Sequence, residues 1–378
     1  MTPELIFWWA AGLILYVYPG YPLLLWGLQH FFSRPVRKRP IQPTVSLLVA
    51  ACNEAGVIEE KIRNSLALDY PPDRLEIIIA SDGSTDGTVA LAERISREAG
   101  AGGRVRVFAD PRHRGKLATL NGAVSQLRSE IIVFSDASSI LTPHAIRSLA
   151  ANFADPEVGA VSGLYRLRKK GDAALGHQED LYWKYETFLK RQEAALGSVL
   201  GAHGALYAVR RKLYPFPPPA TINDDYVIPV RILQQGYRVA YEPDAVAYEE
   251  ARDMEGFSRR VRLMTGNFQQ LRELQGLCRP LQPLPLFFFL SHKAGRLAVP
   301  LAMLALAFSN ALLLSAPFYW WTWHGQALFY GLVALGAVWR IRPRFLRLPY
   351  YFCMINAAAF LGIYHALIKR RVAWKQGS

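Results

Sequence analysis

Two carboxylates follow short apolar runs in the middle of the chain. Asp82 comes after residues 75–80 and Asp136 after residues 131–134, and both runs are typical of buried β-strands. A carboxylate beside such a strand is costly unless it binds a partner. Asp136 is therefore a candidate ligand for Mg²⁺ or Mn²⁺, which take oxygen ligands and share substrate phosphates. Asp82 is a candidate acceptor of a hydrogen bond from a base or ribose, and the alternative for both residues is a cap of a turn or helix.

A pair of acids opens a predicted helix further along the chain. Asp224 and Asp225 precede an amphipathic pattern at residues 226–235 that ends at Gly236. Adjacent carboxylates raise each other's pKa, which suits a general base that works near neutral pH. The alternative is that the helix dipole alone stabilises two acids at a helix N-terminus. Asp224 and Asp225 are the candidate catalytic residues.

Three other residues are candidates for binding a nucleotide. Asn53 and Glu54 follow the apolar run at residues 45–50 and are placed to contact a nucleoside. Lys116 opens a predicted helix, where backbone N–H groups and the helix dipole favour an anion such as a diphosphate. The alternatives are a helix cap for Asn53 and an ordinary surface position for Lys116.

Two arginines share one face of a predicted helix. Arg259 and Arg262 are three residues apart, a spacing that brings side chains together on a helix. They could clamp a diphosphate leaving group. The alternative is a basic helix that lies on anionic lipid, which is an equally good description of the neighbouring Arg260.

The glycine-containing segment at residues 201–205 precedes a predicted strand at residues 206–209. This segment is expected to be flexible. His203, with Gly204 beside it, is the candidate group for binding an acceptor. A single histidine is more often structural, and that is the alternative here.

The elements that position these residues alternate between strands and helices. Strands are expected at residues 45–50, 75–80, 104–108 and 131–134, and helices at residues 59–68, 86–98 and 116–127. This order predicts an α/β fold with a mostly parallel sheet and helices on both faces. Ligands of such sheets bind at the carboxyl ends of the strands, where Asp82 and Asp136 are expected.

Uncharged apolar stretches at both ends are long enough to cross a bilayer, which takes about 20 residues. The first lies at residues 5–28, where Pro19 and Pro22 are expected to introduce a kink. About three C-terminal transmembrane helices are expected, at residues 297–315, in the stretch up to about residue 339, and at residues 348–368. The predicted parts are an N-terminal anchor at residues 1–33, a central domain at 43–277 and a C-terminal membrane region at 284–371.

Basic residues flank these stretches and account for much of the formal net charge of +14. The pattern favours a membrane surface, and no nucleic-acid partner is expected. The basic residues after the first stretch place the N-terminus outside and residue 34 onward in the cytoplasm. Strict alternation would put residues 369–371 outside, against the charge rule, so the side of the C-terminus stays open. The three cysteines are far apart, odd in number and lack zinc spacing, so neither a disulfide framework nor a metal site is expected from them.

Taken in order and spacing, these motifs resemble the family 2 glycosyltransferases of bacterial membranes, the group that includes cellulose, chitin, hyaluronan and poly-N-acetylglucosamine synthases. The resemblance implies a nucleotide-sugar-binding domain of the GT-A type. It implies that Asp82 contacts the uracil or ribose and that Asp136 is the first acid of a D-x-D metal motif. Asp225 would be the catalytic base beside Asp224, and Arg259 with Arg262 would hold the diphosphate.

Three positions depart from the family pattern. The D-x-D motif ends in Ser138, the glutamate of the acidic pair is conservatively replaced by Asp224, and the tryptophan of the last motif is Leu263. Because that tryptophan lines the acceptor site of processive synthases, its loss weakens the case for a long polymer product.

The resemblance implies an inverting transfer of a sugar from a nucleotide-sugar, expected to be a UDP-sugar, to a growing polysaccharide or glycan. The expected location is the cytoplasmic face of a bacterial inner membrane, in contact with lipid. Transfer of one sugar to a polyprenyl phosphate or another lipid-linked acceptor is one alternative. A non-catalytic subunit that binds nucleotide-sugars is another, and accessory export subunits stay open.

Overall fold

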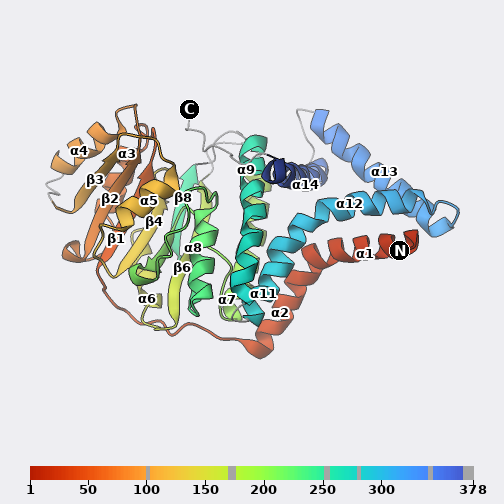
Figure 1. Cartoon of the computed structure of the whole chain (residues 1–378), viewed down its shortest axis with the longest axis horizontal. Coiled ribbons are helices and arrows are strands. Elements are labelled where there is room, and N and C mark those ends of the chain that lie inside the picture. Colours follow the sequence, from red (N-terminus) through yellow and green to blue (C-terminus); the bar gives the residue numbers. More distant parts are fainter. Residues whose placement is uncertain (99–102, 169–175, 251–255, 279–281, 339–343, 369–378) are drawn as a thin grey trace.

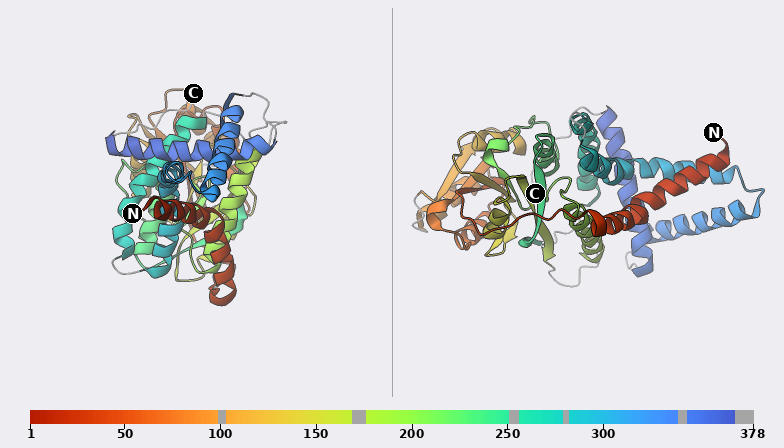
Figure 2. Two further views of the ribbon diagram at one scale, coloured as in Figure 1. Left: turned by 90° about the vertical axis from the view of Figure 1, so that its right-hand side faces the viewer. Right: turned by 90° about the horizontal axis from the view of Figure 1, so that it is seen from below.

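A central sheet and a set of long apolar helices make up the chain. The computed structural model describes residues 1–98, 103–168, 176–250, 256–278, 282–338 and 344–368. The sheet and its covering helices form one end of the molecule, and the apolar helices extend from the other end, with the N-terminus at the far tip (Figure 1; Figure 2).

The sheet has eight strands in the described part of the chain. In chain order they are β1 Val45–Ala51, β2 Leu75–Asp82, β3 Val105–Asp110, β4 Ile131–Asp136, β5 Ile140–Leu141, β6 Val158–Arg168, β7 Tyr207–Arg210 and β8 Arg238–Glu250. Their order across the sheet is β3-β2-β1-β4-β7-β6-β8-β5. The strands predicted from apolar runs are confirmed, and β2 and β4 extend far enough to include Asp82 and Asp136.

Both faces of the sheet are covered by helices, as predicted. Side chains of β1 alternate between the two cores, with Leu48 on one face and Leu47 and Val49 on the other. This burial on both sides explains the continuous apolar runs of the inner strands. The helices that cover the two faces are α3 Ile58–Leu66, α4 Thr88–Glu98, α5 Lys116–Val124, α6 Ala145–Asn152, α7 Gly176–Ala195 and α8 Asp224–Gln234.

The sheet is mixed but mostly parallel, as expected, because four of the seven strand pairings among the described residues are parallel. β1 pairs in parallel with β2 and β4, and β2 pairs in parallel with β3. β7 runs antiparallel to both of its neighbours, β4 and β6. The reversal follows from the short segment 201–206, which leads directly into β7 beside the end of β4.

Three helices of the described residues are long and apolar enough to cross a membrane, namely Pro3–Phe32, Pro283–Ala311 and Pro349–Ile368. The first comprises α1 Pro3–Leu15, a π-helical turn Tyr16–Gly20 and α2 Tyr21–Phe32. The turn contains Pro19, and the helix changes direction there as predicted (Figure 1).

The structure has one C-terminal candidate span fewer than expected among the described residues. α13 Pro317–Val338 forms, but it does not belong to the helices that are apolar enough to cross a membrane. Its first half carries Thr322, His324 and Gln326 among several aromatic residues, which lowers its mean hydropathy. Two C-terminal helices therefore qualify, where three were expected.

A buried ionic cluster joins α7 to the apolar helices. The Tyr21 hydroxyl donates to Oε1 of Glu193 at 2.8 Å, and Nδ1 of His292 lies 2.8 Å from the same oxygen. On the other side of His292, Glu186 forms ion pairs with His292 and with Arg296. We call these five residues the junction cluster.

Candidate active site

Lys116 and two carboxylates meet at the carboxyl ends of the central strands. Lys116 is the first residue of α5, Asp136 the last residue of β4 and Asp224 the first residue of α8. Nζ of Lys116 lies 3.1 Å from Oδ1 of Asp136 and 3.5 Å from Oδ1 of Asp224. A small pocket is lined by these three side chains together with Gly204 and Tyr207. The sequence-predicted residues from three distant segments are thus brought together.

Gly204 separates the two carboxylates that are predicted to bind metal and to act as base. A Cβ placed on Gly204 would lie 3.4 Å from Oδ2 of Asp225 and 3.7 Å from Oδ2 of Asp136. The glycine therefore keeps open the space that both oxygens face. Sequence reasoning named Gly204 only as a neighbour of His203, but its place in the structure is between the acids.

The charges in this pocket stabilise one another. Burial alone would lower the pKa of Lys116, but the carboxylates of Asp136, Asp224 and Asp225 raise it above its usual range. Lys116 therefore stays protonated at any physiological pH. A fixed positive charge at a helix N-terminus is suited to binding a diphosphate.

Asp225 differs from Asp224 in its partners. Asp224 binds Lys116 and accepts a hydrogen bond from the Tyr207 hydroxyl at 3.3 Å. Among the described residues, no donor is found for the carboxylate of Asp225, which is partly exposed. Burial, and then the charge of Asp224, raise the pKa of Asp225 to about 6, although Lys116 opposes the shift. The role of Asp225 as the catalytic base stays a prediction.

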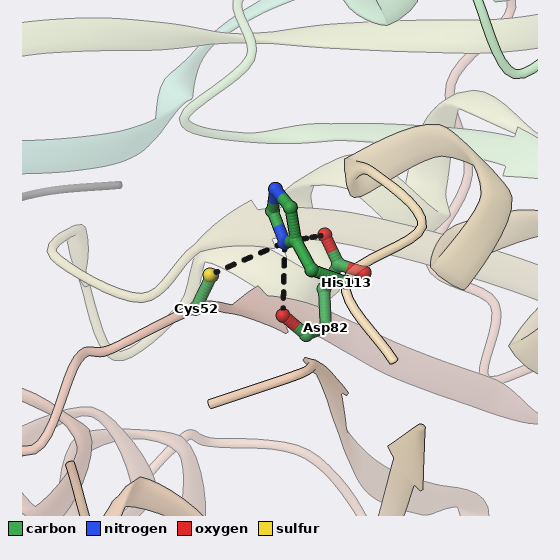
Figure 3. Close-up of side chains that lie close together, drawn as sticks. All are labelled: Cys52, Asp82 and His113. Carbon is green, nitrogen blue, oxygen red and sulfur yellow. Dashed lines mark hydrogen bonds and ion pairs between the residues drawn. The ribbon is translucent and has the colours of Figure 1, made fainter. Parts of the chain in front are cut away.

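Asp82 holds the turn that delivers Lys116. Its carboxylate is almost fully buried and accepts hydrogen bonds from the backbone N–H groups of Arg114, at 2.7 Å, and Gly115, at 3.0 Å. Nδ1 of His113 lies 3.0 Å from Oδ2 of Asp82 and 3.8 Å from Sγ of Cys52 (Figure 3). The contact of Asp82 with a nucleoside stays a prediction.

The same three side chains have the donor types of a metal site. The ligand atoms of Cys52, Asp82 and His113 all lie within 4.8 Å of one another. In Figure 3 the dashed contacts converge on a single nitrogen, Nδ1 of His113. Cys52 and His113 were missed by sequence reasoning, since they come from separate loops and no spacing rule links them.

Asn53 and Glu54 bind the neighbouring loop. Oδ1 of Asn53 accepts from the backbone N–H of Thr85 at 2.8 Å, and the N–H of Glu54 donates to Thr88 at 2.9 Å. Helix α3 begins later, after Val57, so Asn53 is not its cap. The nucleoside contacts of both residues stay predictions.

The arginine pair lies on α9 Gly256–Gln269, which packs against α14 Arg344–Ile368. The side chain of Arg259 is outside the described residues, and Arg262 is partly exposed. The adjacent Arg260 donates to the Tyr351 hydroxyl on α14 at 2.9 Å. A diphosphate contact of Arg259 and Arg262 stays a prediction.

The segment at residues 201–205 is held in place, which corrects the expectation of flexibility. Nζ of Lys190 donates to the carbonyl of Gly201 at 2.8 Å, and the N–H of Ala202 donates to the carbonyl of Asp225 at 2.7 Å. Lys190 was missed because its burial on α7 depends on tertiary packing. Burial, and then the charge of Lys293, lower the pKa of Lys190 to about 8.

His203 is buried under aromatic rings. Its ring centroid is 5.5 Å from that of Trp183 and 6.4 Å from that of Tyr165. Burial, and then the charge of Lys190, hold the pKa of His203 well below its usual value, so the ring is neutral. Its Nε2 has no hydrogen-bond partner among the described residues. Whether it contacts an acceptor stays a prediction.

The sheet topology and the grouping of acids with a lysine at the strand ends are those expected of a glycosyltransferase. The chain belongs to glycosyltransferase family 2, since a family model described as "Glycosyltransferase like family 2" matches residues 43–267. The predicted family and enzyme class are thereby confirmed.

Curated relatives and a solved structure are similar to this chain over most of its length. The poly-beta-1,6-N-acetyl-D-glucosamine synthase of Staphylococcus aureus (strain MSSA476) is 28% identical over 276 residues, which are 68% of this chain and 65% of that protein. The N-acetylglucosaminyltransferase of Rhizobium meliloti (strain 1021) is 25% identical over 77% of this chain and 70% of that protein. The chain is thus close to polysaccharide synthases, although the first match spans less than two thirds of the relative's own length.

The solved structure is the mannosyltransferase PcManGT from Pyrobaculum calidifontis in complex with GDP-Man and Mn²⁺. It is 24% identical with a TM-score of 0.76, and the match covers 98% of this chain and 100% of that chain. This likeness concerns the fold, and it confirms the predicted GT-A type.

Filling the space at Gly204 should reduce turnover without unfolding the protein. In Gly204→Ala the new methyl group would touch both acids at ordinary contact distances, so the fold has room for it. It would occupy the space between the two acids that the substrates are proposed to enter, and a misplacement of reacting groups by about 1 Å costs about 10²-fold in rate. Sugar transfer and the melting temperature would be measured together. Gly122→Ala on α5 is the control, because its Cβ would enter open space, and an unchanged rate in Gly204→Ala would contradict the assignment.

Proposed function

We propose that this chain is an inverting glycosyltransferase that moves a sugar from a UDP-sugar to a growing glycan. The observation that supports this most directly is the grouping of Lys116, Asp136 and Asp225 around Gly204. A cation for the diphosphate and a carboxylate of raised pKa for the acceptor are the two groups that such a transfer needs. Two relatives named for N-acetylglucosamine make that sugar the first donor to test.

A divalent ion, Mg²⁺ or Mn²⁺, fits the residues around Gly204. The donors there are carboxylate oxygens, which hard cations prefer, and the missing Cβ of Gly204 leaves space between them. Asp136 would hold the ion, since its side chain is partly exposed at the end of β4. When bound, such an ion would neutralise charge on the donor diphosphate. Mn²⁺ accompanies the nucleotide-sugar in the structurally similar mannosyltransferase.

In the proposed reaction Asp225 takes the proton from an acceptor hydroxyl. The hydroxyl oxygen then attacks the anomeric carbon, and the bond between that carbon and the diphosphate oxygen breaks. The nucleoside diphosphate leaves with the electron pair, so in-line attack inverts the configuration. Lys116 offsets the charge that develops on the diphosphate, and Arg259 and Arg262 are proposed to assist. No acid is required, because a diphosphate leaves without being protonated.

A lipid-linked acceptor is the second candidate. Helix α8, which begins with the two acids, touches the start of the apolar helix Pro283–Ala311, where Nζ of Lys293 lies 5.1 Å from the ring centroid of Tyr226. An acceptor anchored in the bilayer would therefore have a short path to Asp225. Leu263, in place of the family's tryptophan, also favours an acceptor other than a long polymer.

We place the reaction at the cytoplasmic face of a bacterial inner membrane. The three apolar helices support membrane association, and the basic residues after the first helix support this orientation. Arg34 and Lys38 lie on the sheet side of that helix, where they form ion pairs with Glu157 and Glu242.

A donor screen tests the proposed function. The full chain in bacterial membranes would be given UDP-sugars and GDP-sugars with Mn²⁺, and release of nucleoside diphosphate and product size would be followed. Release of UDP from UDP-N-acetylglucosamine is expected, with a glycan product. A product that partitions into organic solvent would favour the lipid-linked acceptor. Absence of nucleoside diphosphate release from every donor, with membranes lacking the chain as the baseline, would contradict a transferase of this donor class.

A further inference from the structure

The metal motif of this chain lacks its second acid, and a distant glutamate binds the residue that stands there. The Ser138 hydroxyl donates to Oε1 of Glu249 at 3.1 Å. The two residues are 111 positions apart in the sequence. Antiparallel pairing of β5 with β8 brings them together, since Ile140 is opposite Tyr248 and both Ser138 and Glu249 lie just beyond this pair.

Glu249 is fixed by three hydroxyl groups. Besides Ser138, the Ser139 hydroxyl donates to Oε1 at 2.7 Å and the Tyr165 hydroxyl donates to Oε2 at 3.2 Å. Three donors from three positions leave the carboxylate little freedom to rotate. Its negative charge is therefore held at one place, within hydrogen-bond distance of the Ser138 hydroxyl.

No cation is bound to this carboxylate among the described residues. The nearby Lys61 is fully buried, but its Nζ donates to Oγ of Ser135 and to the carbonyl of Ser139, both at 2.6 Å. Among the described residues, the hydrogen-bond partners of Glu249 are neutral hydroxyls, and the charge of Lys61 acts on Glu249 without a direct ion pair. A carboxylate that is oriented by hydroxyls and has no direct ion pair in the described part of the chain, beside a motif that ends two residues after Asp136, is suited to a cation site.

The direction of the hydrogen bond specifies how Ser138 would take part. A hydroxyl that donates its proton to a carboxylate keeps both lone pairs for accepting, and the hydrogen bond makes its oxygen more electron-rich. Such outer partners orient and tune the groups that face a metal ion. Ser138 and Glu249 together thus offer an oxygen ligand backed by a full negative charge.

We propose that Glu249 replaces the missing second acid of the motif as a positioning residue. It orients the Ser138 hydroxyl toward the divalent ion held by Asp136 and supplies the negative charge that an aspartate at position 138 would carry. This inference rests on the part of the proposed function that places a metal-bound diphosphate at Asp136. A purely structural role, in which Glu249 only joins β5 to β8, is the alternative.

Metal affinity tests the proposal without relying on catalysis. Mn²⁺ binding to the detergent-solubilised full chain would be measured by electron paramagnetic resonance in the presence of UDP. Glu249→Gln keeps the shape of the side chain and removes its charge, and it is expected to weaken Mn²⁺ binding by about tenfold or more. Glu250→Gln, at the exposed next position of β8, is the matched control and should bind Mn²⁺ as the unmodified chain does.

A rescue variant separates the proposed role from a structural one. Ser138→Asp in the Glu249→Gln background returns a carboxylate to the motif, and Mn²⁺ affinity should recover toward that of the unmodified chain. Unchanged affinity in Glu249→Gln would overturn the proposal. So would a loss that Ser138→Asp does not restore, because a structural defect in the pairing of β5 with β8 would persist. The melting temperature of each variant shows whether it folds.

The outcomes also separate this inference from the proposed function. If the unmodified chain binds Mn²⁺ with UDP and responds to these substitutions but transfers no sugar, the proposed function fails and the role of Glu249 stands. If the unmodified chain binds no Mn²⁺ in the presence of UDP, the role of Glu249 is overturned whether or not sugar is transferred.

Discussion

Replacing Asp225 with asparagine should lower kcat by about 10²- to 10⁴-fold, the range that a positioned general base contributes. The amide cannot take a proton from the acceptor, whereas its size matches the carboxylate, so donor binding should change little. The substitution also removes one of the negative charges around Lys116, but Asp136 and Asp224 still hold that lysine. Initial rates with saturating donor, and a separate measurement of UDP binding, would show the two effects.

The pH dependence of the unmodified chain provides an independent check on the same residue. Because the pKa of Asp225 is raised to about 6, its basic form dominates above that pH. Activity should therefore fall as the pH is lowered through about 6 and be constant at higher pH. Asp244→Asn removes an exposed carboxylate from β8 and serves as the control for Asp225→Asn, because it makes the same chemical change outside the pocket. Full turnover by Asp225→Asn would show that another group is the base.

Replacing Asp136 with asparagine should remove most metal-dependent activity. Losing one electrostatic contact to the reacting groups typically lowers kcat by about 10²- to 10³-fold. Asp136 is the acid that remains in the D-x-D motif, because position 138 is a serine. Lys116 would lose its closest carboxylate at 3.1 Å but would keep Asp224 at 3.5 Å. Rates would be measured across a range of Mn²⁺ concentrations after treatment with a chelator.

The unmodified chain is the reference for this experiment. Chelation should abolish its activity and added Mn²⁺ should restore it, whereas Asp136→Asn should stay slow at every Mn²⁺ concentration. If the variant responded to Mn²⁺ as the unmodified chain does, Asp136 would not be the ligand. Activity that is indifferent to chelation in both proteins would instead indicate a reaction without a divalent ion.

Much of the sheet was predictable because its inner strands are buried on both faces. β1, β2 and β4 consist of unbroken apolar runs, and such runs are distinctive in a sequence. β6 and β8 were not predicted, since β6 contains Gly159 and Gly163 and β8 contains Pro243, residues that usually interrupt strands. Gly163 is required where it stands, because a Cβ there would come within 2.8 Å of a backbone carbonyl of β8.

The site was predictable only where a residue lies next to a recognisable element end. Asp136, Lys116 and Asp224 each begin or end a strand or helix, and their meeting follows from the topology of the sheet. Tyr207 reaches Asp224, and Glu249 reaches Ser138, only because distant strands pair, and no local pattern marks such pairings. The family resemblance showed that position 138 lacks the expected acid. It could not predict that Glu249 lies next to this position.

The junction cluster determines whether the protein can be divided. Tyr21 and His292, from two different apolar helices, both bind Glu193 of α7, and Lys190 of the same helix holds the Gly201 carbonyl next to Asp225. Removing the apolar helices would take Tyr21 and His292 away from Glu193 and leave it with the backbone N–H of Leu200 at 3.5 Å. Breaking a buried ionic contact costs about 3–5 kcal/mol. The sheet with its candidate acids is therefore expected to depend on the apolar helices for its stability, because α7 connects the two.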